Sequence, residues 1–124
     1  MAGFQPGEKV TLKDLLYGIL LPSGAECCLA YAGHISGTEN DFVNLMNQKA
    51  KDLGMHHTHF SNTTGLHSED HYTTAEDMAL LLQYSLSNEI FREAFTSQTY
   101  DVRPTNIHPE GLTFRSTLFK GLEK

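Results

Sequence analysis

The sequence lacks both the long apolar run and the basic clusters that mark two large classes of proteins. No stretch of 18 apolar residues occurs, and the longest run, Leu15–Pro22, is interrupted by Gly18. The sequence therefore predicts no membrane-spanning helix. Basic residues number 9 against 15 acidic ones, for a formal net charge of −6. Binding to a phosphate backbone needs clustered Lys and Arg, so we expect no nucleic-acid partner. Met1–Phe4 show neither the basic nor the apolar region of an export signal.

Cysteine is also scarce, because Cys27 and Cys28 are the only two. Adjacent cysteines seldom bridge each other, since the ring that they would close strains the peptide between them. We expect both thiols to be reduced and at least partly buried, as small apolar side chains on a helix.

The remaining composition is that of a globular domain. Hydrophobic residues make up 40% and charged residues 19% of the 124 residues, which argues against disorder. A domain of this length buries roughly two-thirds of its extended-chain surface. We therefore expect a single domain that needs no disulfide to be stable.

Periodicity and capping residues predict five helices followed by one hairpin. Thr11 and Asp14 approximate a capping box at the start of the first helix, and Thr73 and Glu76 form another at the fourth, with Thr74 as the other possible cap. Thr38 is the predicted cap of the third helix, and Gly54 stands where a glycine is expected to end it. The second helix is apolar nearly all round, as a buried helix is. The predicted elements are helices over residues 12–20, Ala25–Ile35, Glu39–Leu53, residues 74 to about 88 and Glu89–Phe95, and strands over Gln98–Arg103 and Leu112–Ser116.

The stretch Val10–Glu26 carries the most informative feature, a serine on a tight turn between two apolar helices. Such a turn leaves the hydroxyl of Ser23 free of helical back-bonding, and the flanking helices fix its position. The stretch closely resembles the region around the second active-site motif of the low-molecular-mass penicillin-binding proteins, the serine D-Ala-D-Ala carboxypeptidases. The resemblance continues through Asn44–Met55, Thr58–His67 and His71–Leu81.

The resemblance implies a catalytic role for Ser23. The family uses three elements: Ser-x-x-Lys with the nucleophile and its base, Ser-x-Asn, and Lys-Thr-Gly. The nucleophile forms an acyl-enzyme with a peptidoglycan stem peptide, the terminal D-alanine leaves, and water deacylates the serine. Ser23 matches the serine of the second element, which relays protons. Ala25 stands where the asparagine that holds the substrate amide is expected, so that contact is lost unless Glu26 or a residue outside this chain supplies it.

The other two elements are absent from the sequence. No serine is followed by Lys at the third position, and no Lys-Thr-Gly occurs. Thr117–Lys120 has the spacing with the wrong hydroxyl and follows the hairpin, so we assign Lys120 no role. In the family, the first element precedes a segment like Gly3–Lys9 and the third follows one like Ser116–Lys124. We therefore expect an internal piece of such an enzyme that is inactive by itself, with beta-lactams binding only to the full-length protein.

The expected fold class is α+β and mostly helical. Residues 1–124 would form a single, partial helical subdomain with a β-hairpin, part of a transpeptidase/β-lactamase-like fold without its main sheet. An apolar face left uncovered by that sheet predicts self-association. The resemblance also implies a location outside the cytoplasm, at the outer face of the bacterial cytoplasmic membrane, the stem peptide as partner, and no cofactor.

Two other functions remain open at this point. One is a non-catalytic cell-wall-binding or interaction module of the same fold, in which Ser23–Ala25 is only a turn. The other is a zinc-binding domain, because His-x-His on an extended segment points two imidazoles to one face. No His-Glu-x-x-His occurs, so we favour solvated loop histidines and expect no metal. The histidines concerned are His56, His57, His59, His67 and His71.

Overall fold

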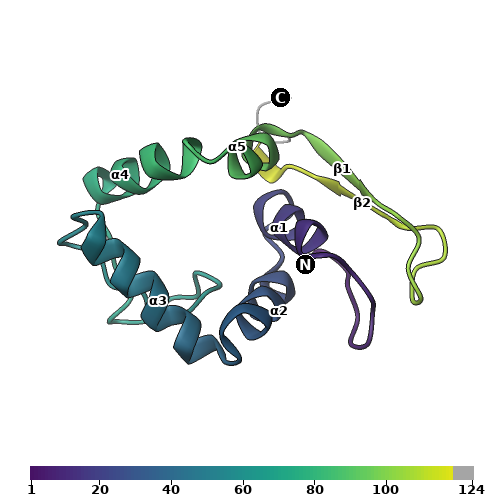
Figure 1. Cartoon of the computed structure of the whole chain (residues 1–124), viewed down its shortest axis with the longest axis horizontal. Coiled ribbons are helices and arrows are strands. Elements are labelled where there is room, and N and C mark those ends of the chain that lie inside the picture. Colours follow the sequence, from purple (N-terminus) through teal and green to yellow (C-terminus); the bar gives the residue numbers. More distant parts are fainter. Residues whose placement is uncertain (119–124) are drawn as a thin grey trace. The chain divides into compact units, whose positions relative to one another are not determined.

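The computed structural model describes residues 1–118, so Lys120 lies outside the described residues. The described part contains five helices and one hairpin (Figure 1). The chain forms two compact units, one made of Met1–Tyr31 with the segment that begins at Glu93, the other of Ala32–Arg92. The elements are α1 (Leu12–Leu20), α2 (Ala25–Ser36), α3 (Glu39–Asp52), α4 (Ala75–Leu86), α5 (Glu89–Thr96), β1 (Thr99–Val102) and β2 (Leu112–Arg115).

The capping box at the start of α1 is confirmed. The Asp14 amide donates to Thr11 Oγ1 at 3.0 Å, and the Thr11 amide donates to the Asp14 carboxylate at 3.1 Å. The Tyr100 hydroxyl donates to the other oxygen of Asp14 at 2.7 Å. A single carboxylate thus starts α1 and ties it to β1.

The hairpin packs on α1. β1 and β2 pair antiparallel, with Tyr100 opposite Phe114. Val102 and Phe114 are buried in one cluster with Tyr17, Leu21 and Ala94, and the rings of Tyr17 and Tyr100 stack with centroids 3.9 Å apart. An isolated hairpin is marginal in water, so these contacts account for its presence here. Each strand is four residues long, shorter than the alternation in the sequence predicts.

A buried carboxylate joins the N-terminal turn to the hairpin connection. The Glu8 side chain is 1% exposed and accepts hydrogen bonds from the Thr105 hydroxyl at 2.5 Å, His108 Nδ1 at 2.8 Å and the Gln5 amide at 3.0 Å. Burial alone would raise the pKa of Glu8, but the hydrogen bonds from Thr105 and His108 outweigh it and lower the pKa below its ordinary value.

We expect Glu8→Gln to lower the free energy of unfolding by about 1–3 kcal/mol at pH 7, because it leaves the partly buried donors of Thr105 and His108 without a charged acceptor. Since the folded pKa lies below the unfolded one, the unfolded state binds the proton first as the pH falls. The contribution is therefore complete above the unfolded pKa and is lost as the pH falls through the folded pKa. Urea unfolding at pH 7 and across the acid range measures both effects. Glu110→Gln, in the same connection and exposed, is the control, and equal losses in the two variants would contradict the prediction.

α2 corrects the expectation of a helix that is buried all round. Only Cys27 and Ala32 are buried, while Leu29 and Ile35 are 47% and 48% exposed. α1 covers the Cys27 side so closely that a Cβ at Gly18 would lie 2.5 Å from the Cys27 sulfur. An apolar sequence permits burial on every side, but the burial itself depends on which neighbours pack against the helix.

Neither cysteine forms a disulfide within the described residues, in line with the expected reduced thiols. Cys27 is fully buried and Cys28 partly so, and burial raises the pKa of Cys27 to about 12. At pH 8 only about one Cys27 thiol in ten thousand is then a thiolate, the reactive form. We expect a thiol reagent to label Cys28 much faster than Cys27, and to find two free thiols after unfolding. Rapid labelling of both without denaturant, read by peptide mass spectrometry, would contradict this.

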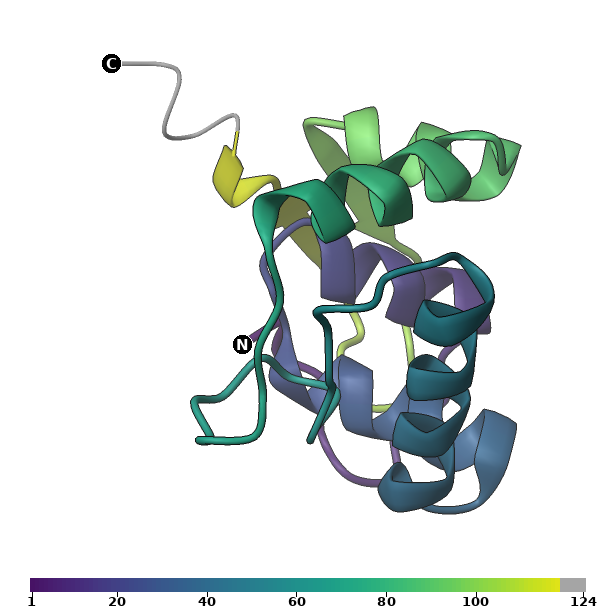
Figure 2. The same ribbon diagram turned by 90° about the vertical axis from the view of Figure 1, so that its left-hand side faces the viewer.

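In the second unit, the start of α4 decides between the two possible caps. Figure 2 shows α3, α4 and the long connection between them. The cap of α4 is Thr74, whose hydroxyl accepts from the Asp77 amide at 3.1 Å, and not Thr73. The Thr73 hydroxyl is instead engaged with that of Thr58 at 2.8 Å. The cap of α3, Thr38, is as predicted.

α4 exposes most of its apolar side chains. Met78, Leu80, Leu82 and Tyr84 are each 40–48% exposed. We expect the chain to self-associate through these exposed apolar side chains, since apolar surface left open to water drives association. Sedimentation at moderate concentration should give a mass above the 13.8 kDa of one chain.

The variant Leu82→Lys should weaken this association, whereas Gln83→Lys, an exposed polar neighbour on the same helix, should not. A monomer with no dye-accessible apolar surface would be evidence against the prediction.

Candidate functional site

Ser23 stands on the turn between α1 and α2 in an unusual conformation. Its φ is +58°, and among the described residues it is the only non-glycine residue with a positive φ. A non-glycine residue in this region costs on the order of 1 kcal/mol and persists only when its surroundings over-determine it. The residue is exposed, and within residues 1–118 its hydroxyl has no hydrogen-bond partner. The hydroxyl is therefore free to meet a partner or substrate from outside.

Gly24, the residue that follows Ser23, is tightly packed within the turn. Its amide donates to the Gly18 carbonyl at 2.8 Å, and its carbonyl accepts from the amides of Cys27 and Cys28 to start α2. A Cβ at this position would lie 2.9 Å from the Gly18 carbonyl and 2.9 Å from the Ala2 Cβ. The position has no room for any side chain, so the Ser-Gly order of the turn follows from packing.

The next two residues, Ala25 and Glu26, differ in their contacts. Ala25 is exposed and offers no donor or acceptor. The Glu26 carboxylate accepts from the Ala2 amide at 2.9 Å and from the Gly3 amide at 3.3 Å. The contacts of Glu26 are thus with the backbone of the N-terminal segment. Sequence reasoning singled out Ser23, Ala25 and Glu26 but had no signal for this pairing across 24 residues.

The histidines of the second unit help to build the loop between α3 and α4. The Ser61 amide donates to His71 Nδ1 at 2.9 Å, His59 Nδ1 contacts the Asp70 carbonyl, and His59 pairs with Tyr72 in a single β-bridge. Within residues 1–118, no group of three or more His, Cys, Asp or Glu side chains is placed to hold a metal ion.

Asp77 supports the same loop and is a residue that sequence reasoning missed. It is 4% exposed and accepts from the His57 amide at 2.9 Å and the Thr58 hydroxyl at 2.6 Å. These hydrogen bonds, that of Thr58 above all, lower the pKa of Asp77. The available signal was an acid in the first turn of the predicted helix, but it pointed to capping alone.

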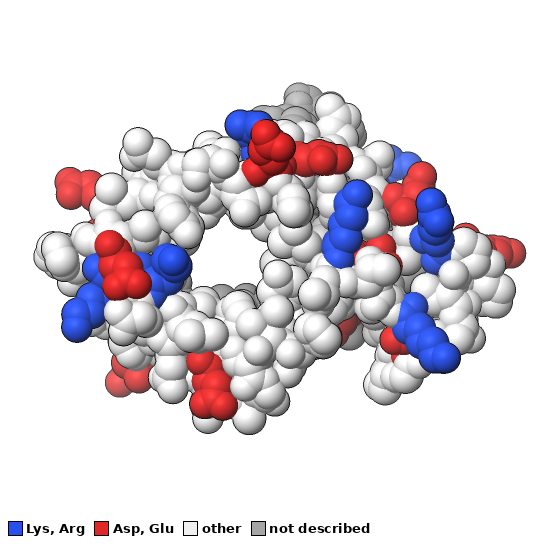
Figure 3. Space-filling model, in the orientation of Figure 1, with Lys and Arg blue, Asp and Glu red and all other residues white. Residues whose placement is uncertain are grey.

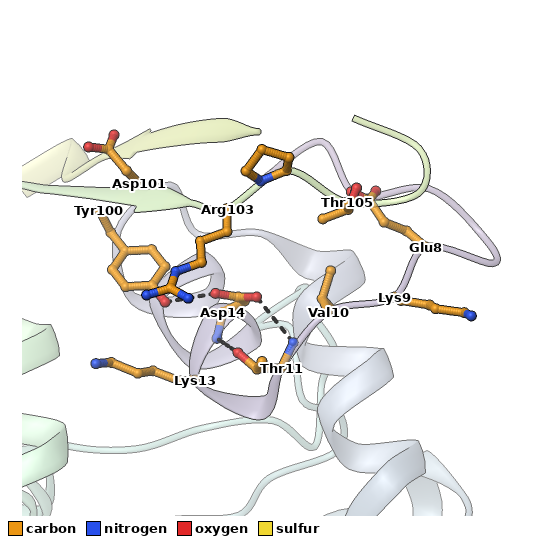
Figure 4. Close-up of a pocket in the computed structure, with 11 residues that line it drawn as sticks. Glu8, Lys9, Val10, Thr11, Lys13, Asp14, Tyr100, Asp101, Arg103 and Thr105 are labelled. Atoms are coloured by element: carbon orange, nitrogen blue, oxygen red, sulfur yellow. Dashed lines mark hydrogen bonds between the residues drawn. The ribbon is translucent and has the colours of Figure 1, made fainter. Parts of the chain in front are cut away.

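One pocket of the first unit does not include Ser23 in its lining. It has a volume of about 890 Å³, and its lining brings α1 together with the hairpin (Figure 4). Burial, with the hydrogen bond to Asp14, raises the pKa of Tyr100 in its wall. Basic and acidic side chains alternate on the face of this unit shown in Figure 3, which gives the cavity no single sign of charge. The charged residues that line it are Glu8, Lys9, Lys13, Asp14, Asp101 and Arg103.

Comparison with known proteins assigns the chain to a class. Residues 2–114 match the peptidase family S11, described as D-alanyl-D-alanine carboxypeptidase. The chain belongs to this family. Within the described residues, no helix has the length and apolar character needed to cross a membrane.

Two curated relatives show how much of the family's length is present. The chain is 47% identical over 85 residues to D-alanyl-D-alanine carboxypeptidase DacF of Bacillus subtilis, an alignment covering 68% of this chain and 22% of the relative. It is 40% identical over 77 residues to DacC of Escherichia coli, covering 62% and 19%. The chain spans about a fifth of these relatives.

Solved structures confirm the expected fold class. The crystal structure of the Streptomyces K15 DD-transpeptidase matches with a TM-score of 0.87 at 28% identity, over 94% of this chain and 48% of that one. A D-alanyl-D-alanine carboxypeptidase from Mycobacterium tuberculosis matches with a TM-score of 0.83 at 26% identity, over 93% and 43%. Five helices and a two-stranded antiparallel sheet form part of the DD-transpeptidase fold.

Proposed function

We propose that the protein carrying this chain is a serine-type D-Ala-D-Ala carboxypeptidase that hydrolyses the terminal D-Ala-D-Ala bond of peptidoglycan stem peptides. The observation that carries the proposal is the Ser23 turn. A serine with an exposed hydroxyl stands in a left-handed conformation beside a glycine that no other residue can replace. Strained residues of this kind cluster at active sites, and the turn matches the family's second active-site element in position.

In this proposal Ser23 relays a proton and does not attack the substrate. A serine of a Ser-x-x-Lys element elsewhere in the protein gives its hydroxyl proton to the lysine of that element and attacks the carbonyl of the penultimate D-alanine. An ester forms as the bond to the last D-alanine breaks. Ser23 passes the proton from the lysine to the departing amine. Water then hydrolyses the ester and restores the serine. The residues present require no cofactor for these steps.

The absence of an amide at Ala25 sets a limit on substrate binding. The substrate amide lacks one oriented hydrogen bond at this position, which costs on the order of 1 kcal/mol or more. The same absence favours the second candidate, a non-catalytic module of the same fold that binds the cell wall. Both candidates place the protein outside the cytoplasm, where peptidoglycan lies, with residues 1–124 as part of its helical subdomain.

Turnover by the full-length protein distinguishes the two candidates. We expect it to release D-alanine from a stem pentapeptide ending in D-Ala-D-Ala, and to form a covalent adduct with a labelled penicillin. The adduct should map to a serine outside this chain. A protein that binds the pentapeptide but neither releases D-alanine nor accepts the label would be the binding module.

A further inference from the structure

Glu26 reaches from the first turn of α2 to a segment more than twenty residues away. Its carboxylate accepts the backbone amides of Ala2 at 2.9 Å and Gly3 at 3.3 Å. Hydrogen bonds to an ionised carboxylate are about twice as strong as neutral ones. Glu26 is the second residue of α2, where the helix dipole also favours a negative charge. The bonds therefore hold the N-terminal segment firmly against the start of the helix.

The segment held in this way packs on the turn that carries Ser23. A Cβ at Gly24 would lie 2.9 Å from the Ala2 Cβ and 2.7 Å from a Glu26 oxygen, and one at Gly18 would lie 3.4 Å from the Ala2 Cβ. The Gly18 carbonyl, Ala2 and Glu26 thus all lie against the position that a side chain at Gly24 would occupy. Ser23, the residue just before it, is the part of the turn that faces solvent.

We propose that Glu26 is a positioning residue for Ser23, acting through the Ala2–Gly3 backbone that it clamps over Gly24. This inference rests on the proposed function for its catalytic consequence, but not for the clamp itself. With the carboxylate removed, the N-terminal segment no longer closes over Gly24, and the left-handed conformation of Ser23 loses one of the contacts that enforce it. Glu26 therefore acts on the backbone of the turn, and it does not replace the substrate contact that is lost with Ala25.

Amide hydrogen exchange in this chain tests the clamp directly. We expect the Gly3 and Gly24 amides to be protected in the unmodified chain, and Glu26→Gln to raise their exchange by about tenfold or more while α3 is unaffected. Glu76→Gln is a matched control, because Glu76 is also the second residue of its helix and is exposed. It should leave the exchange of Gly3 and Gly24 unchanged. If Glu26→Gln does not fold, hydrogen exchange in the unmodified chain still tests the clamp. A Gly3 amide that exchanges at the unprotected rate would contradict the proposal.

Penicillin acylation of the full-length protein tests the effect on Ser23. Glu26→Gln should slow acylation by about tenfold to a hundredfold, as small displacements of a catalytic group do, with penicillin affinity unchanged. Glu26→Asp, which keeps the charge, should recover part of the rate. A purely structural role would lower the amount of folded protein but not the rate per titrated site, and that result would overturn the positioning role. If the unmodified protein does not acylate, the proposed function fails, whereas the exchange experiment still decides the clamp.

Discussion

Mixed with a labelled penicillin, the 124-residue chain should form no covalent adduct, and it should release no D-alanine from a stem pentapeptide. Acyl transfer needs a nucleophile activated by an adjacent base, with oxyanion donors beside it. The sequence contains neither a Ser-x-x-Lys nor a Lys-Thr-Gly element. Ser23 has the exposure of a reactive group, but within residues 1–118 its hydroxyl has no hydrogen-bond partner that could serve as a base.

The expected loss is large enough to measure without ambiguity. Removal of the nucleophile in other serine hydrolases costs about a million-fold in kcat, so turnover by this chain should fall below detection. Intact-mass spectrometry after a long incubation checks the adduct, with the full-length protein as the positive control. A stoichiometric adduct on Ser23 would contradict the relay role and make Ser23 the nucleophile.

The parts of the fold that the sequence predicted correctly depend on local chemistry. A capping box needs two side chains three residues apart, so Thr11 and Asp14 could be recognised directly. The same holds for Thr38 and for Gly54, which adopts a positive φ after α3. In each case the competing interactions lie within one turn of helix, and the sequence displays all of them.

The parts that escaped prediction depend on partners distant in the chain. Thr73 and Thr74 have nearly the same local context, and the contact of Thr73 with Thr58 leaves Thr74 as the cap of α4. Asp77 could be placed in a first turn, but its bonds to residues 57 and 58 could not. At the site, Ser23 was found by its pattern. The left-handed backbone of Ser23 was not predicted, because a Ser-Gly pair does not show which of its two residues adopts the positive φ.

The second large effect is expected for Ser23→Ala in the full-length protein. If Ser23 relays a proton during acylation, its loss should slow acylation by penicillin by about 10²–10⁴-fold, the usual range for removal of a general acid–base group. Binding of penicillin before the chemical step should change little, because the hydroxyl acts on the proton and the turn remains. Stopped-flow acylation separates the two quantities.

Ser23→Gly separates the hydroxyl from the backbone that presents it. Glycine adopts the φ of +58° freely, so this variant should be more stable than Ser23→Ala by about 1 kcal/mol, measured by urea unfolding of the 124-residue chain. Both variants lack the hydroxyl, and a proton relay requires that both acylate equally slowly, although Ser23→Gly relieves the backbone strain and Ser23→Ala does not. If Ser23→Gly acylated at the unmodified rate, the turn would serve the site through its backbone alone, and Ser23 would have no part in proton transfer.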